Sequence, residues 1–207
     1  MPGFHMDTER ANKKISDTAI WAITPNGLAL GTRLARRSCG MTLFVSRRLD
    51  PGHLDVDTHK FDRLENEIHL RFKQFNRHLF IFSTGIAVRM IAPLLESKLK
   101  DPAVAVMDDR GNHVISLVSG HLGGANELAL DIGRLTGAQP VITTATDTNC
   151  VPAIDMIAKN SGLLIENPEA IKHINMAFLK GYKIGLFDPF QIISQQLDPI
   201  YYQVEES

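Results

Sequence analysis

The fold class of this 207-residue chain is decided by the stretch Pro102–Glu127, PAVAVMDDRGNHVISLVSGHLGGANE. Two apolar runs, Pro102–Met107 and His113–Val118, have the length of buried strands, and the polar segment between them predicts a hairpin with a longer loop. A glycine-rich link, Ser119–Gly124, then leads into a segment whose apolar residues recur with the period of a helix. The stretch therefore predicts an antiparallel strand pair followed by a helix.

Outside this stretch, predicted strands and helices alternate along the chain. The expected strands are Ala19–Thr24, Met41–Ser46, His78–Ser83, Pro140–Thr144, a short Leu163–Ile165 and Tyr182–Phe187. The expected helices are Leu28–Ser38, His59–Asn76, one after Gly85 that Pro93 ends or kinks, one after Gly124, Val151–Lys159 and one from Pro168 to Leu179. Pro25-Asn26-Gly27 and Ala145–Asn149 are expected turns. This alternation predicts an α/β fold, a mostly parallel sheet with helices on both faces and one antiparallel hairpin.

Three regions are expected along the chain. Residues 1–18 form a flexible tail, residues 19–148 form an α/β domain that contains the glycine-rich loop, and residues 149–207 form a helix-rich middle region with a late strand. No apolar run approaches the roughly 18 residues of a membrane span, and the first residues do not resemble a signal peptide. Two cysteines are too few for a disulfide scaffold. A cytoplasmic protein is expected.

The formal net charge of −1 hides an asymmetry between the two halves of the chain. Residues 1–100 carry 16 Lys and Arg against 10 Asp and Glu, whereas residues 101–207 carry 6 against 13. The near-neutral total argues against a uniformly basic nucleic-acid binder. The basic half, with Arg33 and Arg37 on one predicted helix, is either a solvated surface or a surface that attracts a polyanionic small molecule.

In mostly parallel sheets, ligands bind beyond the carboxyl ends of the strands. This rule selects the loops Thr24–Gly27, Ser46–Asp57, Ser83–Gly85, Ser119–Gly124 and Thr143–Asn149. The glycine-rich one is the most informative, because glycines allow close approach of a ligand and the start of the next helix offers free N–H groups. The alternative is a tight structural turn capped by Ser119 or Asn126. Neither a P-loop nor a dinucleotide fingerprint is present.

Several side chains in these loops could carry chemistry. His121 is either a general base or a structural histidine, and Glu127 follows it by six residues. Thr143, Thr144 and Asp147 could hold a carboxylate or orient a base, or simply cap a turn. Gly85 precedes Arg89, whose guanidinium could clamp a carboxylate or pair with Asp101. No spacing in the sequence supports a metal site.

The ordered series of motifs resembles one known family, the CbiG proteins, which are cobalt-precorrin-5A hydrolases of anaerobic cobalamin biosynthesis. The series runs through GIAVR (85–89), IAPLL (91–95), DPAV (101–104), VISL (114–117), SGHLGGANE (119–127) and PVITTATD (140–147), and continues through PAID (152–155) and ENPE (166–169). The resemblance is dense between Phe80 and Asp147. Residues 1–78 share only the strand–helix pattern.

The resemblance implies an enzyme that opens the ring A δ-lactone of cobalt-precorrin-5A with water and releases acetaldehyde. Cobalt is then part of the substrate, and no separate cofactor is expected. Substrate carboxylates would be bound by Arg89 and, more weakly, by Arg33 and Arg37. The loop around Ser119, Gly120, Gly123, Gly124 and Asn126, together with Gly85, Thr143 and Thr144, would contact substrate. His121 would act as base, with Asp147 supporting it and Glu127 as a further catalytic candidate.

Family members usually continue into a further α/β domain of about a hundred residues, and this sequence is expected to hold only the N-terminal and middle regions. We therefore keep two hypotheses, a catalytic hydrolase chain and a corrinoid-binding or scaffold subunit that needs a separate C-terminal domain chain. A homodimer is a further possibility, whereas nucleic acid and membrane partners are not expected. A generic nucleotide-binding protein is disfavoured by the missing Lys-Ser/Thr pair.

Overall fold

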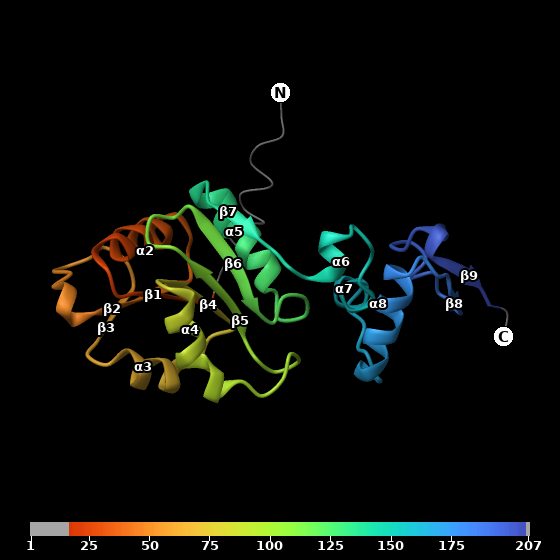
Figure 1. The fold of residues 1–207 in the computed structure, drawn as a ribbon, viewed down its shortest axis with the longest axis horizontal. Coiled ribbons are helices and arrows are strands. Elements are labelled where there is room, and N and C mark those ends of the chain that lie inside the picture. Colours follow the sequence, from red (N-terminus) through yellow and green to blue (C-terminus); the bar gives the residue numbers. More distant parts are fainter. Residues whose placement is uncertain (1–16, 206–207) are drawn as a thin grey trace, which may run out of the picture. The chain divides into compact units, whose positions relative to one another are not determined.

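The computed structural model describes residues 17–205, which form two compact units, one ending at Val141 and the other beginning at Ile142 (Figure 1). Residues 1–16 of the expected tail lie outside the described part, and Thr18 already begins the first strand. The division falls before the boundary at residues 148 and 149 that we expected from the sequence. Each unit is considered separately below.

The first unit is built on a seven-stranded sheet in the order β3-β2-β1-β4-β5-β6-β7. Its strands are β1 Thr18–Ala22, β2 Met41–Ser46, β3 Thr58–Phe61, β4 Arg77–Ile81, β5 Ala103–Met107, β6 His113–Val118 and β7 Gln139–Val141. Neighbouring strands from β3 to β5 are parallel, β5 and β6 are antiparallel, and β7 is parallel to β6. The predicted α/β fold with one antiparallel hairpin is confirmed.

Helices cover both faces of this sheet, as the sequence predicts (Figure 1). They are α2 Pro25–Arg37, α3 Leu64–Arg71, α4 Thr84–Ile91 and α5 Ala125–Thr136. One buried cluster joins Leu34 of α2 and Ile132 of α5 to one face. A second cluster joins Ile68, in α3, and Ile91, in α4, to the other. Because both faces are covered, the inner strands are mostly apolar, as in TAIWA of β1 and AVAVM of β5, which explains their clear signal in the sequence.

The expected turn at Pro25-Asn26-Gly27 is wrong, because these residues are the first turn of α2. The hydroxyl of Thr24 accepts a hydrogen bond from the amide of Gly27 at 3.0 Å, and proline at the first helical position needs no amide partner. A Cβ on Gly27 would lie 2.9 Å from the carbonyl oxygen of Ile81. Glycine here therefore lets the helix pack directly against the sheet.

The expected helix at His59–Asn76 is also wrong in its first part. Thr58–Phe61 forms the edge strand β3, and α3 starts only at Leu64. Phe61 has helical spacing to Leu64 and Ile68, yet its side chain is buried from a strand. Pairing of β3 with β2 satisfies the backbone of this segment, so a tertiary contact overrides the local pattern. By contrast, α4 ends at Ile91 and a 3₁₀ turn containing Pro93 follows, as predicted.

An aromatic cluster surrounds His78 in the middle of the first unit. Trp21 stacks on Phe44 with ring centroids 4.3 Å apart, and its indole N–H donates to Nδ1 of His78 at 3.1 Å. The other ring nitrogen lies 2.9 Å from the carbonyl oxygen of Phe72, so it carries the proton and the imidazole is neutral. Burial lowers the pKa of His78 to about 4.

The second unit contains short elements around a small core of Ile157, Phe178 and Leu197. They are α6 Ala145–Thr148, α7 Ile154–Asn160, α8 Ile171–Leu179, β8 Ile184–Leu186 and β9 Tyr202–Val204. The expected strand at Leu163–Ile165 is wrong, since no strand forms there and Leu164 is 96% exposed. The segment Ala145–Asn149 contains a short helix rather than only a turn. Strand β9, which the sequence did not predict, pairs in parallel with β8. Within residues 17–205, no helix combines the length and apolar character needed to cross a membrane.

Candidate functional site

The reversal of the chain between β5 and β6 divides the predicted loops between two edges of the sheet. Val118, the last residue of β6, lies opposite Val104, near the start of β5. The glycine-rich loop that follows β6 is therefore at the edge where β4 and β5 begin, which we call the amino edge. The loops after β1 and β4 lie at the opposite, carboxyl edge. The expectation that one edge gathers all the selected loops is wrong, because β6 runs against its neighbour β5.

Close packing explains two glycines of the loop between β6 and α5. A Cβ on Gly123 would lie 2.3 Å from Cβ of Ser119, and one on Gly120 would lie 2.8 Å from Oδ1 of Asn126. Gly124 has φ 91° and is itself the N-cap of α5, so the capping expected from Ser119 or Asn126 is wrong. The amides of Ala125 and Asn126 donate to carbonyl oxygens within the loop.

The loop holds one non-glycine residue with unusual backbone geometry, and its amides differ in whether they are already hydrogen-bonded. Ser119 has φ 60°, and its hydroxyl is buried without a hydrogen-bond partner in the described chain. The amide of Gly124 donates to the carbonyl oxygen of His121 at 2.9 Å, so it is not available to a ligand. The amide of Gly123 makes no such bond among the described residues. Only Gly123 of the two expected amides can therefore serve an oxyanion.

This loop forms one wall of a pocket of about 490 Å³ at the amino edge, which we call the basic pocket. Leu122 and Gly123 line it from the loop, and Lys73, Arg77 and Lys100 line it from other segments. Two acids share the pocket but are engaged. Glu96 pairs with Lys73 and Lys100, and the carboxylate of Asp101 accepts a hydrogen bond from the amide of Glu96 at 2.9 Å.

Two predicted catalytic residues of the first unit, Glu127 and His121, are neighbours of residues that line the basic pocket. Glu127, in the first turn of α5, has Oε2 3.7 Å from a guanidinium nitrogen of Arg77. His121 is half-buried and directly precedes the pocket residues Leu122 and Gly123. Thr143, Thr144 and Asp147 belong to the second unit, where Thr144 is the N-cap residue of α6 and Asp147 is exposed. A supporting role for Asp147 stays a prediction.

A second pocket, of about 640 Å³, lies at the carboxyl edge where β1 and β4 end, and we call it the apolar pocket. Its wall includes the apolar side chains Ile23, Phe82 and Ile86. Asp108 lies at its rim, where burial raises the pKa of the carboxyl but hydrogen bonds from the amides of His113, Asn112 and Arg110 outweigh it and lower the pKa. The position fits the rule for ligands at a switch point, because β1 and β4 lead to opposite sides of the sheet.

Gly85 and Arg89 lie in α4, which starts beside the apolar pocket. A Cβ on Gly85 would meet only Nη1 of Arg89 at 3.6 Å and the hydroxyl of Ser83 at 3.8 Å, so packing does not require glycine there. Arg89 is exposed, and its guanidinium is 3.4 Å from the carbonyl oxygen of Gly85. Asp101, the other partner considered for Arg89, instead accepts a hydrogen bond from the amide of Glu96.

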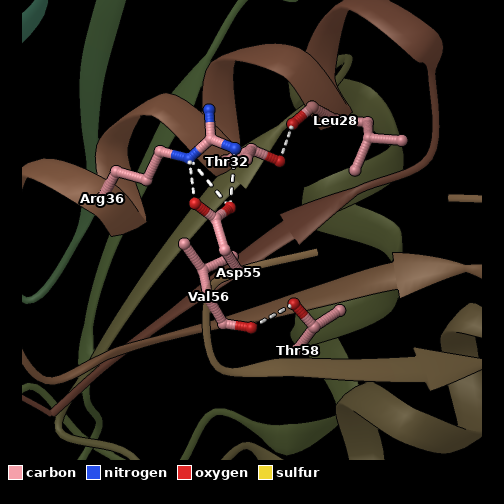
Figure 2. A network of polar contacts seen from close by, with 6 residues as sticks. All are labelled: Leu28, Thr32, Arg36, Asp55, Val56 and Thr58. Atoms are coloured by element: carbon pink, nitrogen blue, oxygen red, sulfur yellow. Dashed lines mark hydrogen bonds and ion pairs between the residues drawn. The ribbon is translucent and has the colours of Figure 1, made fainter. Parts of the chain in front are cut away.

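The arginines of α2 are on the surface of the first unit. Arg33 and Arg37 are exposed, and Arg37 donates to the carbonyl oxygen of Leu135 at 2.5 Å. Arg36, between them, forms a bidentate pair with Asp55, with the shortest contact at 2.6 Å (Figure 2). This pair raises the pKa of Arg36 and lowers that of Asp55. Part of the basic character of this helix is thus neutralised by a surface ion pair.

Sequence reasoning missed Lys73, Lys100 and above all Arg77. Each was part of an ordinary charged segment, and the loop rule pointed to the carboxyl edge. The signal that could have found Arg77 is its position directly before the buried strand that we predicted from His78 onward. Among the described side chains, no group of three His, Cys, Asp or Glu is placed to hold a metal ion.

Comparison with known proteins assigns the chain to a family. Residues 67–147 match the family described as "Cobalamin synthesis G N-terminal", and residues 152–204 match "Cobalamin biosynthesis central region". The chain belongs to the CbiG family. These two matches cover more than half of its residues, and the resemblance carried by the ordered motifs is confirmed.

Curated relatives agree with this assignment. The chain is 40% identical over 176 residues to the cobalt-precorrin-5A hydrolase of Salmonella typhimurium, a match that covers 84% of this chain and 49% of the relative. It is 32% identical to the enzyme of the same name from Priestia megaterium, over 82% of this chain and 46% of that protein. This CbiG chain thus spans about half the length of the curated relatives it matches.

A solved structure of a cobalamin biosynthesis protein G homologue from Sulfolobus solfataricus is also similar. It has 24% sequence identity and a TM-score of 0.48, over 83% of this chain and 48% of that one.

Proposed function

We propose that this chain takes part in the hydrolytic opening of the ring A δ-lactone of cobalt-precorrin-5A, with release of acetaldehyde. Membership of the CbiG family places the chain in cobalamin biosynthesis as a homologue of cobalt-precorrin-5A hydrolases. The reaction and the substrate are attributed to the relatives, so for this chain they form the proposal.

One observation supports a site at the amino edge, namely that the glycine-rich loop forms a wall of the basic pocket. A corrinoid intermediate carries several carboxylate side chains, and a cationic group of the pocket, such as Arg77, can pair with one of them. The same pocket exposes the backbone of Gly123, whose open amide can donate to an oxygen. The site therefore combines binding groups for the substrate periphery with a donor for a reacting carbonyl.

The chemistry assigned to these residues is an acyl transfer to water followed by carbon–carbon cleavage. His121 would act as the general base and take the proton from the attacking water. Negative charge then develops on the lactone carbonyl oxygen, where the amide of Gly123 would stabilise it. The lactone C–O bond breaks to give a carboxylate and an alcohol. The alcohol then loses its proton and becomes the carbonyl of acetaldehyde as the carbon–carbon bond to the ring breaks, and the ring carbon takes up a proton.

A second candidate is a corrinoid-binding chain that needs a partner for catalysis. The chain matches about half of each curated relative, so the test includes the other half. The test is acetaldehyde release from cobalt-precorrin-5A by the purified chain, alone and mixed with the C-terminal half of the Salmonella typhimurium relative. Release by the chain alone supports a self-sufficient hydrolase, whereas release only on mixing supports the binding chain. No release in either case, with the full-length relative active in parallel, contradicts both.

A further inference from the structure

The basic pocket contains one cationic group that the described chain leaves incompletely paired. Nη1 of Arg77 is buried and has no hydrogen-bond partner within residues 17–205. The nearest acid, Glu127, is 3.7 Å from the other terminal nitrogen, Nη2, which is beyond hydrogen-bonding distance. A guanidinium has five N–H donors, and a buried charged donor without an acceptor is costly. Nη1 itself has almost no accessible surface, so a ligand in the basic pocket can meet this guanidinium only through its accessible part.

Arg77 is also held more tightly than the other basic groups of the first unit that form ion pairs. Its side chain is 16% exposed, compared with 62% for Lys73 and 75% for Lys100 at the same pocket. It begins the central strand β4, which is hydrogen-bonded to β1 and β5 on its two sides. A donor on such a rigid element is preorganised, so a ligand loses little free energy in ordering it.

The charged residues around the basic pocket show what kind of ligand group can pair with Arg77 there. Lys73 and Lys100 are both within 4.0 Å of Glu96, and Asp101 is engaged by a backbone amide. With Glu127 beside Arg77, the acids equal the bases in number, so net charge alone does not attract an anion. Arg77 has no hydrogen-bonded acceptor within residues 17–205, and its guanidinium calls for an acceptor oxygen of high charge density, as a carboxylate provides.

The shape of the pocket adds a second requirement. Phe75, Leu122 and Pro102 contribute an apolar surface beside the charged groups. A short side chain of methylene groups that ends in a carboxylate matches both parts, because its stem contacts the apolar surface and its oxygen reaches the guanidinium. The exposed arginines Arg33 and Arg89 offer no comparable enclosure.

We propose that Arg77 binds one peripheral carboxylate of the corrinoid substrate through the accessible part of its guanidinium, with Glu127 remaining beside Nη2. This inference rests on the proposed function, since it takes the substrate from there. Arg77 is in this role a substrate-binding residue that sets the position of the macrocycle relative to the loop containing His121.

The test compares binding of cobalt-precorrin-5A to the whole 207-residue chain and to two variants. Arg77→Met keeps a long unbranched side chain without charge, and Arg77→Lys keeps the charge but loses the forked geometry. We expect the dissociation constant to rise about 10- to 100-fold for Arg77→Met, as for loss of a charge-assisted hydrogen bond, and by a smaller factor for Arg77→Lys. Arg36→Met, which removes an exposed arginine of α2, is the matched control and should bind as the wild type does.

A chemical control identifies the ligand group. A methyl ester form of the same corrinoid, which lacks the charged oxygens, should bind wild type and Arg77→Met equally. Circular dichroism of each variant checks that the fold is retained, and Arg77→Lys keeps a cation beside Glu127 if Arg77→Met does not fold.

The outcomes separate the two proposals. If the wild-type chain binds the corrinoid and the folded Arg77 variants bind it with the same dissociation constant, the role of Arg77 is overturned. The proposed function is then unaffected. A variant with unchanged substrate affinity but a lower kcat also overturns it, because a carboxylate-binding residue acts on affinity. A wild-type chain that does not bind the corrinoid overturns both proposals together.

Discussion

The two edges of the seven-stranded sheet carry pockets of opposite character. At the carboxyl edge, the apolar pocket lies over the ends of β1 and β4 and has an apolar wall with acids at its rim. At the amino edge, the basic pocket gathers three cationic side chains and the glycine-rich loop. The general rule for parallel sheets selects the first edge, whereas the chemistry expected of a polycarboxylate substrate selects the second. The comparison shows that reversal of a single strand, β6, places the glycine-rich loop at the edge opposite to the one that the fold class predicts.

The largest expected effect concerns the two histidines associated with the two edges. His121→Ala should lower kcat for acetaldehyde release by about 10²- to 10⁴-fold if His121 is the general base that we propose for the amino edge. His113→Ala, at the rim of the apolar pocket, should leave kcat unchanged. Steady-state kinetics, in whichever preparation of the chain is active, measure both. Retained turnover by His121→Ala would place the base elsewhere.

Lowering the pH should reduce the folding stability of the first unit through protonation of His78, which lies in the core between the two edges. The pKa of His78 is about 4 in the folded chain and about 6.5 in the unfolded chain, so the unfolded chain binds the proton first. The stability that His78 supplies is complete above about pH 6.5 and is lost as the pH falls toward 4, by about 3 kcal/mol.

Urea unfolding followed by fluorescence measures this loss, because Trp21 is the only tryptophan and contacts His78. His78→Gln should be less stable at neutral pH but should show a smaller dependence on pH. An equal pH dependence in both proteins would mean that another group titrates.

Gly123 at the amino edge and Gly85 at the carboxyl edge differ in how closely other atoms pack against them. Gly123→Ala should destabilise the first unit by about 1–3 kcal/mol, because the new Cβ would overlap Ser119. Gly85→Ala, at the start of α4, should change the stability by less than about 1 kcal/mol, since only ordinary contacts await the new atom. Thermal unfolding of both variants is the measurement. Equal melting temperatures would show that the glycine-rich loop can adopt another conformation.

The smallest effect is expected for the exposed arginines. Arg89→Met should raise KM about two- to fivefold, because an exposed ion pair with substrate is screened by water. Arg36→Met provides the control on a neighbouring helix surface. An effect of Arg89→Met as large as that of Arg77→Met would move the main carboxylate site from the basic pocket to α4.

Sequence reasoning predicted the elements that carry a strong local signal. The strands β1, β2, β4, β5 and β6 were found because both faces of the sheet are covered and the runs are mostly apolar. The edge strand β3 was missed because Phe61 happens to have helical spacing to the next segment, and pairing with β2 decided its conformation. The short β9 was missed for the same reason, since its pairing with β8 joins segments distant in sequence.

The candidate site was predictable only in its chemical components. The loop Ser119–Glu127 was singled out from its glycines and its histidine, and the ordered motifs led to the family. Arg77 carries no motif, so only its enclosure beside Gly123 and Glu127 distinguishes it from other arginines.

By itself the sequence determined the α/β class, the hairpin between β5 and β6 and the CbiG family, because strand runs, turn residues and ordered motifs are local in the chain. The tertiary structure alone decided which residues meet at each edge. That depends on the direction of β6 relative to β5 and on burial of Arg77, both of which arise from contacts between segments far apart in the chain. The partners of a charged side chain are set by packing, and no pattern of residues along the chain records them.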